Sequence, residues 1–164
     1  MSAAKRVALA GVMTAATMVL SYIETLVPLP VGIPGIKLGL ANSGVMSALY
    51  LLGPGWACAV SIVRVVLSGL LFGGFSAMLY SLAGAVFALA SMISLKTASD
   101  RFGMVGVSVA GGVTHIVGQL VVAWLVTRTA MVWTYAPVLF AAACATGVLN
   151  GIIAGLVVRS LVRS

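Results

Sequence analysis

Six apolar stretches, separated by short polar or Gly- and Pro-containing connections, make up most of the chain. They cover residues 7–27, 40–52, 55–72, 76–95, 103–126 and 135–158. About 20 apolar residues are enough to cross a bilayer as a helix, and a helix satisfies its own backbone groups in lipid. We therefore predict an all-α integral membrane protein, a bundle of six transmembrane helices forming one domain over residues 1–164. The second stretch is short, so it either extends into the Pro-rich segment before it or falls short of the membrane face.

Composition agrees with this fold class. Of the 164 residues, 62% are hydrophobic and 7% are charged, whereas a soluble domain carries about a quarter charged residues. A soluble enzyme and a disordered tail are thereby excluded. The net charge of +7 would suggest nucleic acid in a soluble chain, but membrane topology explains it better, so we expect no nucleic-acid partner.

The basic residues are distributed unevenly between the two sides of the predicted bundle. If the N-terminus is cytoplasmic, the outer connections carry Lys37 and Arg128. The inner connections carry Lys5, Arg6, Lys96, Arg101, Arg159 and Arg163. This excess follows the rule that cytoplasmic loops are richer in Lys and Arg. It predicts that both termini are cytoplasmic.

The chain offers little for catalysis. Its two acidic residues, Glu24 and Asp100, cannot provide the clustered carboxylates that hold Mg²⁺ for diphosphate chemistry. One histidine and two cysteines leave no conventional zinc or haem site. No phosphate-binding G-x-x-x-x-G-K-[ST] motif occurs. We expect neither a metal nor a cofactor, and no enzyme activity from this chain by itself.

Arg64 lies near the middle of the third stretch, where a charge is costly and usually marks a functional site. Ser61 and Ser68 share its helix face. Two interpretations remain open. Arg64 forms a structural contact, with Glu24 or with a backbone carbonyl, or it binds an anionic ligand.

Further polar residues are predicted at the same outer half of the bundle. The candidate ligand-binding residues, with Arg64, are Glu24, Lys37, Asn42, Tyr80, His115 and Gln119. The arginine and the lysine favour a small anionic substrate, since guanidinium groups suit carboxylate and phosphate oxygens. We predict a pocket open to the outside. The segment PLPVGIPGIK at residues 28–37 would serve as a lid or as a plain connector.

Three of these polar positions have a second, purely structural interpretation. Asn42 opens the second helix and either caps it or binds the ligand. Tyr80 either lines the pocket or belongs to the aromatic belt at the membrane interface. Asn150 lies in the inner half of the last helix, where we expect it to bond Thr146 or a neighbouring helix.

Small residues at spacings of three or four let membrane helices approach closely. In the last helix Gly147, Gly151 and Gly155 form such a row, and we predict that it packs within the chain. The first helix has a second row, which is either an internal packing face or a docking face for a partner helix. It consists of Ala4, Ala8, Gly11 and Ala15.

Four sequence segments resemble a known bacterial membrane family. They are PGIKLGLAN at 34–42, SIVRVVLSGLLFGG at 61–74, LYSLAG at 79–84 and GGVTHIVGQL at 111–120. The family is catalogued as heptaprenyl diphosphate synthase component I and also as a Gx transporter family. The resemblance covers nearly the whole chain and implies a multi-pass protein of the bacterial cytoplasmic membrane.

The wider group includes the S-components of energy-coupling factor transporters, which are six-helix proteins that bind vitamins or related molecules from outside. The resemblance implies a transmembrane coupling protein and two ATPases as partners, docked through the small residues of the first helix. Our main hypothesis is therefore a substrate-capturing S-component for a small anion. The alternative is a non-catalytic membrane partner of a heptaprenyl or polyprenyl diphosphate synthase. A subunit of flavin- or quinone-linked electron transfer is a third hypothesis.

Overall fold

The structure is a computed structural model that describes residues 2–26, 37, 39–98 and 102–163, and all regular structure among these residues is helical. The helices are α1 (Ala3–Leu26), α2 (Asn42–Leu51), α3 (Pro54–Ser68), α4 (Gly74–Ala98), α5 (Met104–Thr127) and α6 (Ala136–Arg163). A π-helical turn, η1 (Gly69–Gly73), joins α3 to α4, and a 3₁₀ turn, η2 (Ala130–Tyr135), leads into α6. The all-α prediction is confirmed, with helix ends within a few residues of the apolar stretches.

Four helical stretches among the described residues are long and apolar enough to cross a membrane. They are Ala3–Leu26, Pro54–Ala98, Met104–Thr127 and Ala130–Arg163. The second of these contains α3, η1 and α4. By length and composition, the chain is a multi-pass membrane protein. Helix α2 has 10 residues and is about 15 Å long, half the thickness of the hydrocarbon core, so a bundle of six complete spans stays a prediction.

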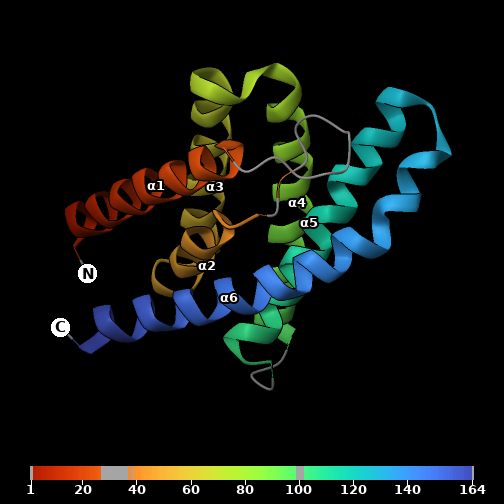
Figure 1. Cartoon of the computed structure of the whole chain (residues 1–164). Helices are drawn as coiled ribbons and strands as arrows, with labels where there is room; N and C mark the ends of the chain where they lie inside the picture. Colours follow the sequence, from red (N-terminus) through yellow and green to blue (C-terminus); the bar gives the residue numbers. More distant parts are fainter. Residues whose placement is uncertain (1, 27–36, 38, 99–101, 164) are drawn as a thin grey trace.

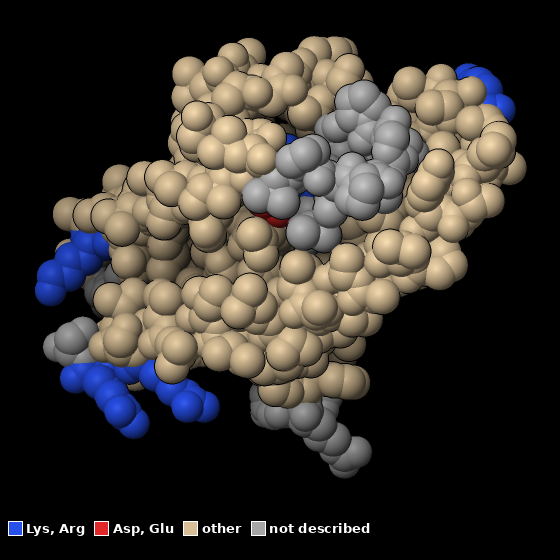
Figure 2. All heavy atoms as spheres, viewed as in Figure 1, with Lys and Arg blue, Asp and Glu red and all other residues tan. Residues whose placement is uncertain are grey.

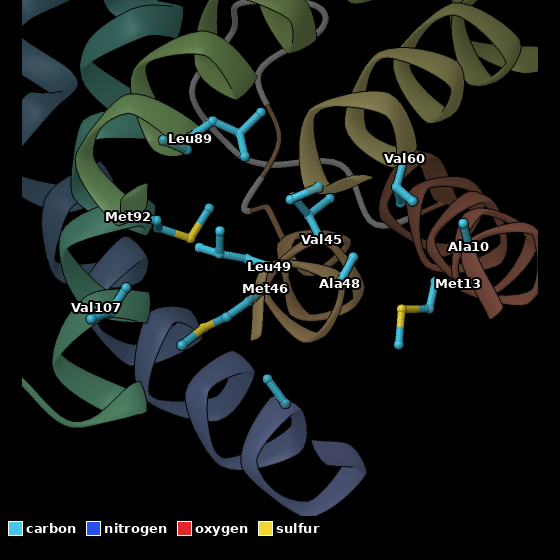
Figure 3. Packing of buried hydrophobic residues seen from close by; sticks show 13 residues of the cluster. Ala10, Met13, Val45, Met46, Ala48, Leu49, Val60, Leu89, Met92 and Val107 are labelled. Atoms are coloured by element: carbon cyan, nitrogen blue, oxygen red, sulfur yellow. The ribbon is translucent and has the colours of Figure 1, made fainter. Parts of the chain in front are cut away.

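Helix α2 lies between α1, α3 and α6 and also contacts α5 (Figure 1). Its residues Val45, Met46, Ala48 and Leu49 are at most 1% exposed. They belong to one apolar cluster with side chains from α1, α3, α4, α5 and α6, most of which are labelled in Figure 3. Because α2 is enclosed by protein, it positions the residues directly before it in the interior.

Helix α5 packs between α4 and α6 through glycines. A Cβ atom at Gly147 would lie 2.7 Å from Val109 Cα, and one at Gly151 would lie 2.6 Å from Val105 Cα. A Cβ atom at Gly118 would lie 2.7 Å from the Ala83 carbonyl oxygen of α4. The backbones of these helices therefore touch, as small residues permit. The prediction that the glycine row of α6 packs within the chain is confirmed for Gly147 and Gly151.

Both chain ends lie at one end of the molecule, and η1 and the turn between α5 and α6 lie away from them (Figure 1). Figure 2 shows basic side chains gathered at the end with the termini and a smaller group at the opposite end. This distribution agrees with the predicted excess of cytoplasmic Lys and Arg. The cytoplasmic location of the termini remains a prediction.

Candidate functional site

Arg64 is buried in the interior and its guanidinium group is only partly hydrogen-bonded. The residue is 4% exposed, and Nη1 donates to the Ser21 hydroxyl of α1 at 3.2 Å. Its Nε and Nη2 atoms are buried without a partner among the described residues, as is the Ser68 hydroxyl one turn later. A buried charged donor without an acceptor is costly. These atoms are therefore hydrogen-bonding groups that no described residue uses.

Glu24 lies one turn after Ser21 on α1 and is 8% exposed. Its Oε1 atom accepts a hydrogen bond from the Leu40 backbone N–H at 2.7 Å. The positive charges of Arg64 and Lys37 act on this carboxyl group, but no direct hydrogen bond or salt bridge joins Glu24 to Arg64 in the described part of the chain. The direct Arg64–Glu24 pair, which was one structural interpretation of Arg64, is therefore not formed.

Residues 37 and 39–41, which we call the central segment, are held by three helices. The Lys37 backbone N–H donates to Gln119 Oε1 of α5 at 3.3 Å. The Gly39 carbonyl accepts from Asn150 Nδ2 of α6 at 2.9 Å, and Leu40 is bonded to Glu24 of α1. Gly39 has a φ of +83°, which glycine adopts without steric cost. These contacts fix Lys37 and Asn42 at the two ends of the segment.

His115 and Gln119 form a buried pair on α5. Their Nε2 atoms lie 3.0 Å apart, and both residues are at most 2% exposed. The imidazole ring lies against Gly84 of α4, where a Cβ atom would come within 2.6 Å of it. The glycines of α5 near His115 have other neighbours, because Gly111 contacts Met92 and Gly118 contacts the backbone of α4.

Asn42 is the first residue of α2, but Ala41 occupies the N-cap position without a side-chain capping bond. The capping interpretation of Asn42 is therefore wrong. Its side chain is 6% exposed, and Nδ2 is buried without a partner in the described part of the chain. Asn42 Nδ2 lies 3.0 Å from the position of a Cβ on Gly39. The amide thus adds another unused donor to the interior.

Tyr80 is placed differently from the other candidates. It is 6% exposed and packs in an apolar cluster with Ala123 of α5 and Val132 of η2. A buried ring of this kind is not part of a lipid-facing aromatic belt, so that interpretation is wrong. Among the described contacts, none connects Tyr80 to the residues around Arg64.

The remaining polar residues converge on one region, which we call the polar centre. It comprises Ser21, Glu24, Lys37, Asn42, Arg64, His115, Gln119 and Asn150. The charge of Arg64 acts on Lys37 as well as on Glu24. Burial is the main cause that lowers the pKa of the Lys37 ammonium group, Glu24 raises it, and Arg64 lowers it further. The polar centre therefore contains two basic groups and one carboxyl group that act on one another.

Two members of the polar centre, Ser21 and Asn150, were not predicted from the sequence, and neither was Gly84, which lies against His115. Ser21 was not a candidate, and Asn150 was assigned to contacts elsewhere, although it bonds the central segment. Gly84 lies against His115, and its small size was the only indication of this role in the sequence.

The lid predicted at residues 28–37 lies outside the described residues except for Lys37. Within the described ranges, no group of three or more His, Cys, Asp or Glu residues could hold a metal ion.

The small-residue row of α1 points away from the rest of the molecule. Ala4, Ala8, Gly11 and Ala15 are all exposed, and a Cβ atom at Gly11 would meet nothing within 4 Å. The row therefore does not pack within the described part of the chain. It is free to contact lipid or another helix.

Comparison with known families identifies the chain. The model of the family described as heptaprenyl diphosphate synthase component I matches residues 13–157. The chain belongs to this family. The match extends from α1 to α6 and includes all members of the polar centre. Comparisons with curated proteins and with solved structures gave no match. Because the family is one component of a synthase, it agrees with the expectation that this chain is not an enzyme by itself.

Proposed function

We propose that this chain is the non-catalytic membrane subunit of a polyprenyl diphosphate synthase. The observation that carries the proposal is the family match over residues 13–157, on a chain with several membrane-spanning helices. Prenyl elongation needs carboxylates that hold Mg²⁺ and the diphosphate, and this chain has two acidic residues. A separate catalytic subunit supplies the chemistry, and the membrane subunit holds it where a long apolar product leaves water.

We place the catalytic subunit at the end of the molecule that carries the termini. That end has the larger group of basic side chains (Figure 2). Basic ends of membrane helices face the cytoplasm, where a soluble synthase is located.

The test is co-expression with the catalytic polyprenyl diphosphate synthase subunit of the same organism, followed by purification in mild detergent. We expect a stable complex and synthase activity in the membrane fraction. A short-chain prenyl transferase is the control, because its product stays soluble and it needs no membrane subunit. Equal recovery of both enzymes, or of neither, would contradict the proposal.

The partly bonded guanidinium group of Arg64 favours a second candidate function, that of a substrate-capturing transport subunit. A buried arginine with two unused donor nitrogens, which shares the polar centre with Lys37 and with the unused amide of Asn42, supports capture of a small carboxylate or phosphate. In this function a coupling protein docks on the small-residue row of α1 and two ATPases supply the energy.

Native mass spectrometry of the gently purified protein tests this candidate. It predicts a retained small anion that is lost in Arg64→Gln and weakened in Ser68→Ala, which removes only the unpartnered hydroxyl. Arg128→Asn is the matched control, since Arg128 has a φ of +55° that asparagine tolerates and lies outside the polar centre. An anion retained equally by all variants would exclude Arg64 as its binding residue.

A further inference from the structure

A second site lies on the outside of the bundle, where α1 and α6 separate over α2. The cavity has a volume of about 260 Å³ and opens as a groove. Its walls include Leu9, Val12 and Leu20 of α1 and Ile153 and Leu161 of α6, and Gly44 of α2 lies in its floor. The α1 wall from Leu9 to Leu20 is about 16 Å long at the rise of an α-helix.

The groove is apolar along its length even though hydroxyl residues contribute to it. Thr17 donates to the Thr14 carbonyl, Ser43 to the Leu40 carbonyl and Ser47 to the Ser43 carbonyl. Because these hydroxyl groups are bonded to the backbone, they offer no free donor to an occupant. The groove therefore suits a hydrocarbon chain.

The end of the groove near the termini is basic. Lys5 and Arg6 precede Leu9 by four and three residues, so they lie on the groove side of α1, one turn nearer the terminus. Both side chains are exposed. The last turn of α6 carries Arg163, and Figure 2 shows basic atoms on both sides of the gap between α1 and α6 at this end.

Helix α1 adds to this positive potential. Its first turn contains no acidic residue, and the N-terminus of a helix favours a negatively charged group. An apolar groove that ends at several cations is complementary to an amphiphile with one hydrocarbon chain and a multiply charged anionic head. A phospholipid has the same kind of head but two chains, which a single narrow groove accommodates less well.

We infer that the groove between α1, α2 and α6 binds a long-chain isoprenoid diphosphate, with the diphosphate at Lys5 and Arg6 and the isoprene units nearest to it along residues 9–20 of α1. The inference rests on the proposed function, since the synthase generates this product beside the membrane subunit. The groove would receive the apolar chain as it leaves the soluble catalytic subunit. This site is distinct from the polar centre, since no residue that lines the cavity is a member of the polar centre.

The test measures equilibrium binding of radiolabelled heptaprenyl diphosphate to the chain in phosphatidylcholine nanodiscs, with empty nanodiscs subtracted. No synthase is present, so the result is independent of whether the subunits associate. We expect saturable binding. Lys5→Gln/Arg6→Gln should weaken it by about tenfold or more, as loss of charge-assisted contacts does. The double variant Arg159→Gln/Arg163→Gln removes the same charge from α6 and should have the smaller effect, since Arg159 lines a different cavity, between α5 and α6.

Ala16→Phe places an aromatic ring in the groove and should abolish saturable binding. Ala15→Phe is the matched control, because Ala15 is exposed on the adjacent side of α1 and does not line the groove. Should Ala16→Phe fail to fold, the variant of the exposed Lys5 and Arg6 decides. Unchanged binding in that variant, or equal displacement by phosphatidylglycerol, would overturn the inference and indicate no site or a general lipid site. A chain that binds the diphosphate but not the synthase would instead overturn the proposed function.

Discussion

On one side of α2, helices α4, α5 and α6 touch backbone to backbone through glycines, whereas on the other side α1 stands partly apart and leaves a groove to α6. The difference is visible at the glycines: a Cβ atom at Gly147 or Gly118 would lie 2.7 Å from a backbone atom of the neighbouring helix, whereas one at Gly11 of α1 would meet nothing within 4 Å. In lipid, helices associate by close packing and interhelical hydrogen bonds more than by hydrophobicity. The comparison therefore separates a close-packed side, which sets the stability, from an open side that is available to ligands and partners.

The largest expected effect is on the close-packed side. Gly147→Val should lower the free energy of unfolding by about 3 kcal/mol, because overpacking forces backbones apart and a Cβ at Gly147 meets Val109 Cα. Gly155→Val is the control, since the nearest atom to its Cβ is Met104 Sδ at 3.7 Å. Thermal unfolding in detergent measures both, and equal losses would refute the assignment of α6 packing.

A smaller effect is expected where the close-packed side supports the polar centre. Gly84→Ala should displace His115, whose ring occupies the space of the new methyl group, and disturb its contact with Gln119. We expect a loss of about 1–2 kcal/mol and a change in the His115 NMR signals. Gly106→Ala is the matched control on α5, with its nearest neighbour at 3.9 Å. A similar change in both variants would show that the ring is not held by Gly84.

The polar centre should respond to pH through Lys37. Its lowered pKa means that the ammonium group loses its proton at a lower pH than an exposed lysine, so anion affinity falls as pH rises through that pKa. Binding of sulfate, whose charge stays constant, can be followed from about pH 7 to about pH 10. We expect Lys37→Arg to bind sulfate with little pH dependence. If the wild-type chain and Lys37→Arg show the same profile, Lys37 does not contribute to the site.

The smallest effect is expected on the open side. Gly11→Leu should change the free energy of unfolding by no more than about 0.5 kcal/mol, because a Cβ there meets no atom within 4 Å. The same variant tests whether the row of α1 docks a partner. Loss of an associated coupling protein with unchanged stability would identify the row as an interface. A large loss of stability would show that α1 is packed more closely than the described contacts indicate.

The helices could be predicted from sequence because lipid imposes a strong rule. The helix predicted at 55–72 corresponds to residues 54–73, which form α3 and η1. The two agree because backbone groups in a membrane have few alternatives to helical hydrogen bonding. Arg64, Glu24 and His115 could be predicted as site residues for a related reason. A charged or polar side chain is costly to bury in a membrane, so its presence indicates a specific contact or a function. Gln119 followed because it lies one turn from His115.

The partners of these residues could not be predicted in the same way. A serine such as Ser21 usually bonds its own helix, so nothing local indicates that it reaches Arg64. Asn42 has the side chain of a helix cap, yet Ala41 takes that position because the central segment is fixed by α1, α5 and α6. Tyr80 has a polar group, but its ring decides its place in the apolar cluster. These outcomes depend on contacts far apart in sequence.

The bond between Asn150 and the Gly39 carbonyl joins residues separated by 111 positions. A ribosome that adds about 5–20 residues per second needs on the order of ten seconds to cover that distance. During this interval the Gly39 carbonyl has been made but its final donor has not. The interior therefore reaches its native bonding only after α6 has been inserted, and a chaperone or insertase that shields the unfinished protein would have to remain bound until the last helix arrives.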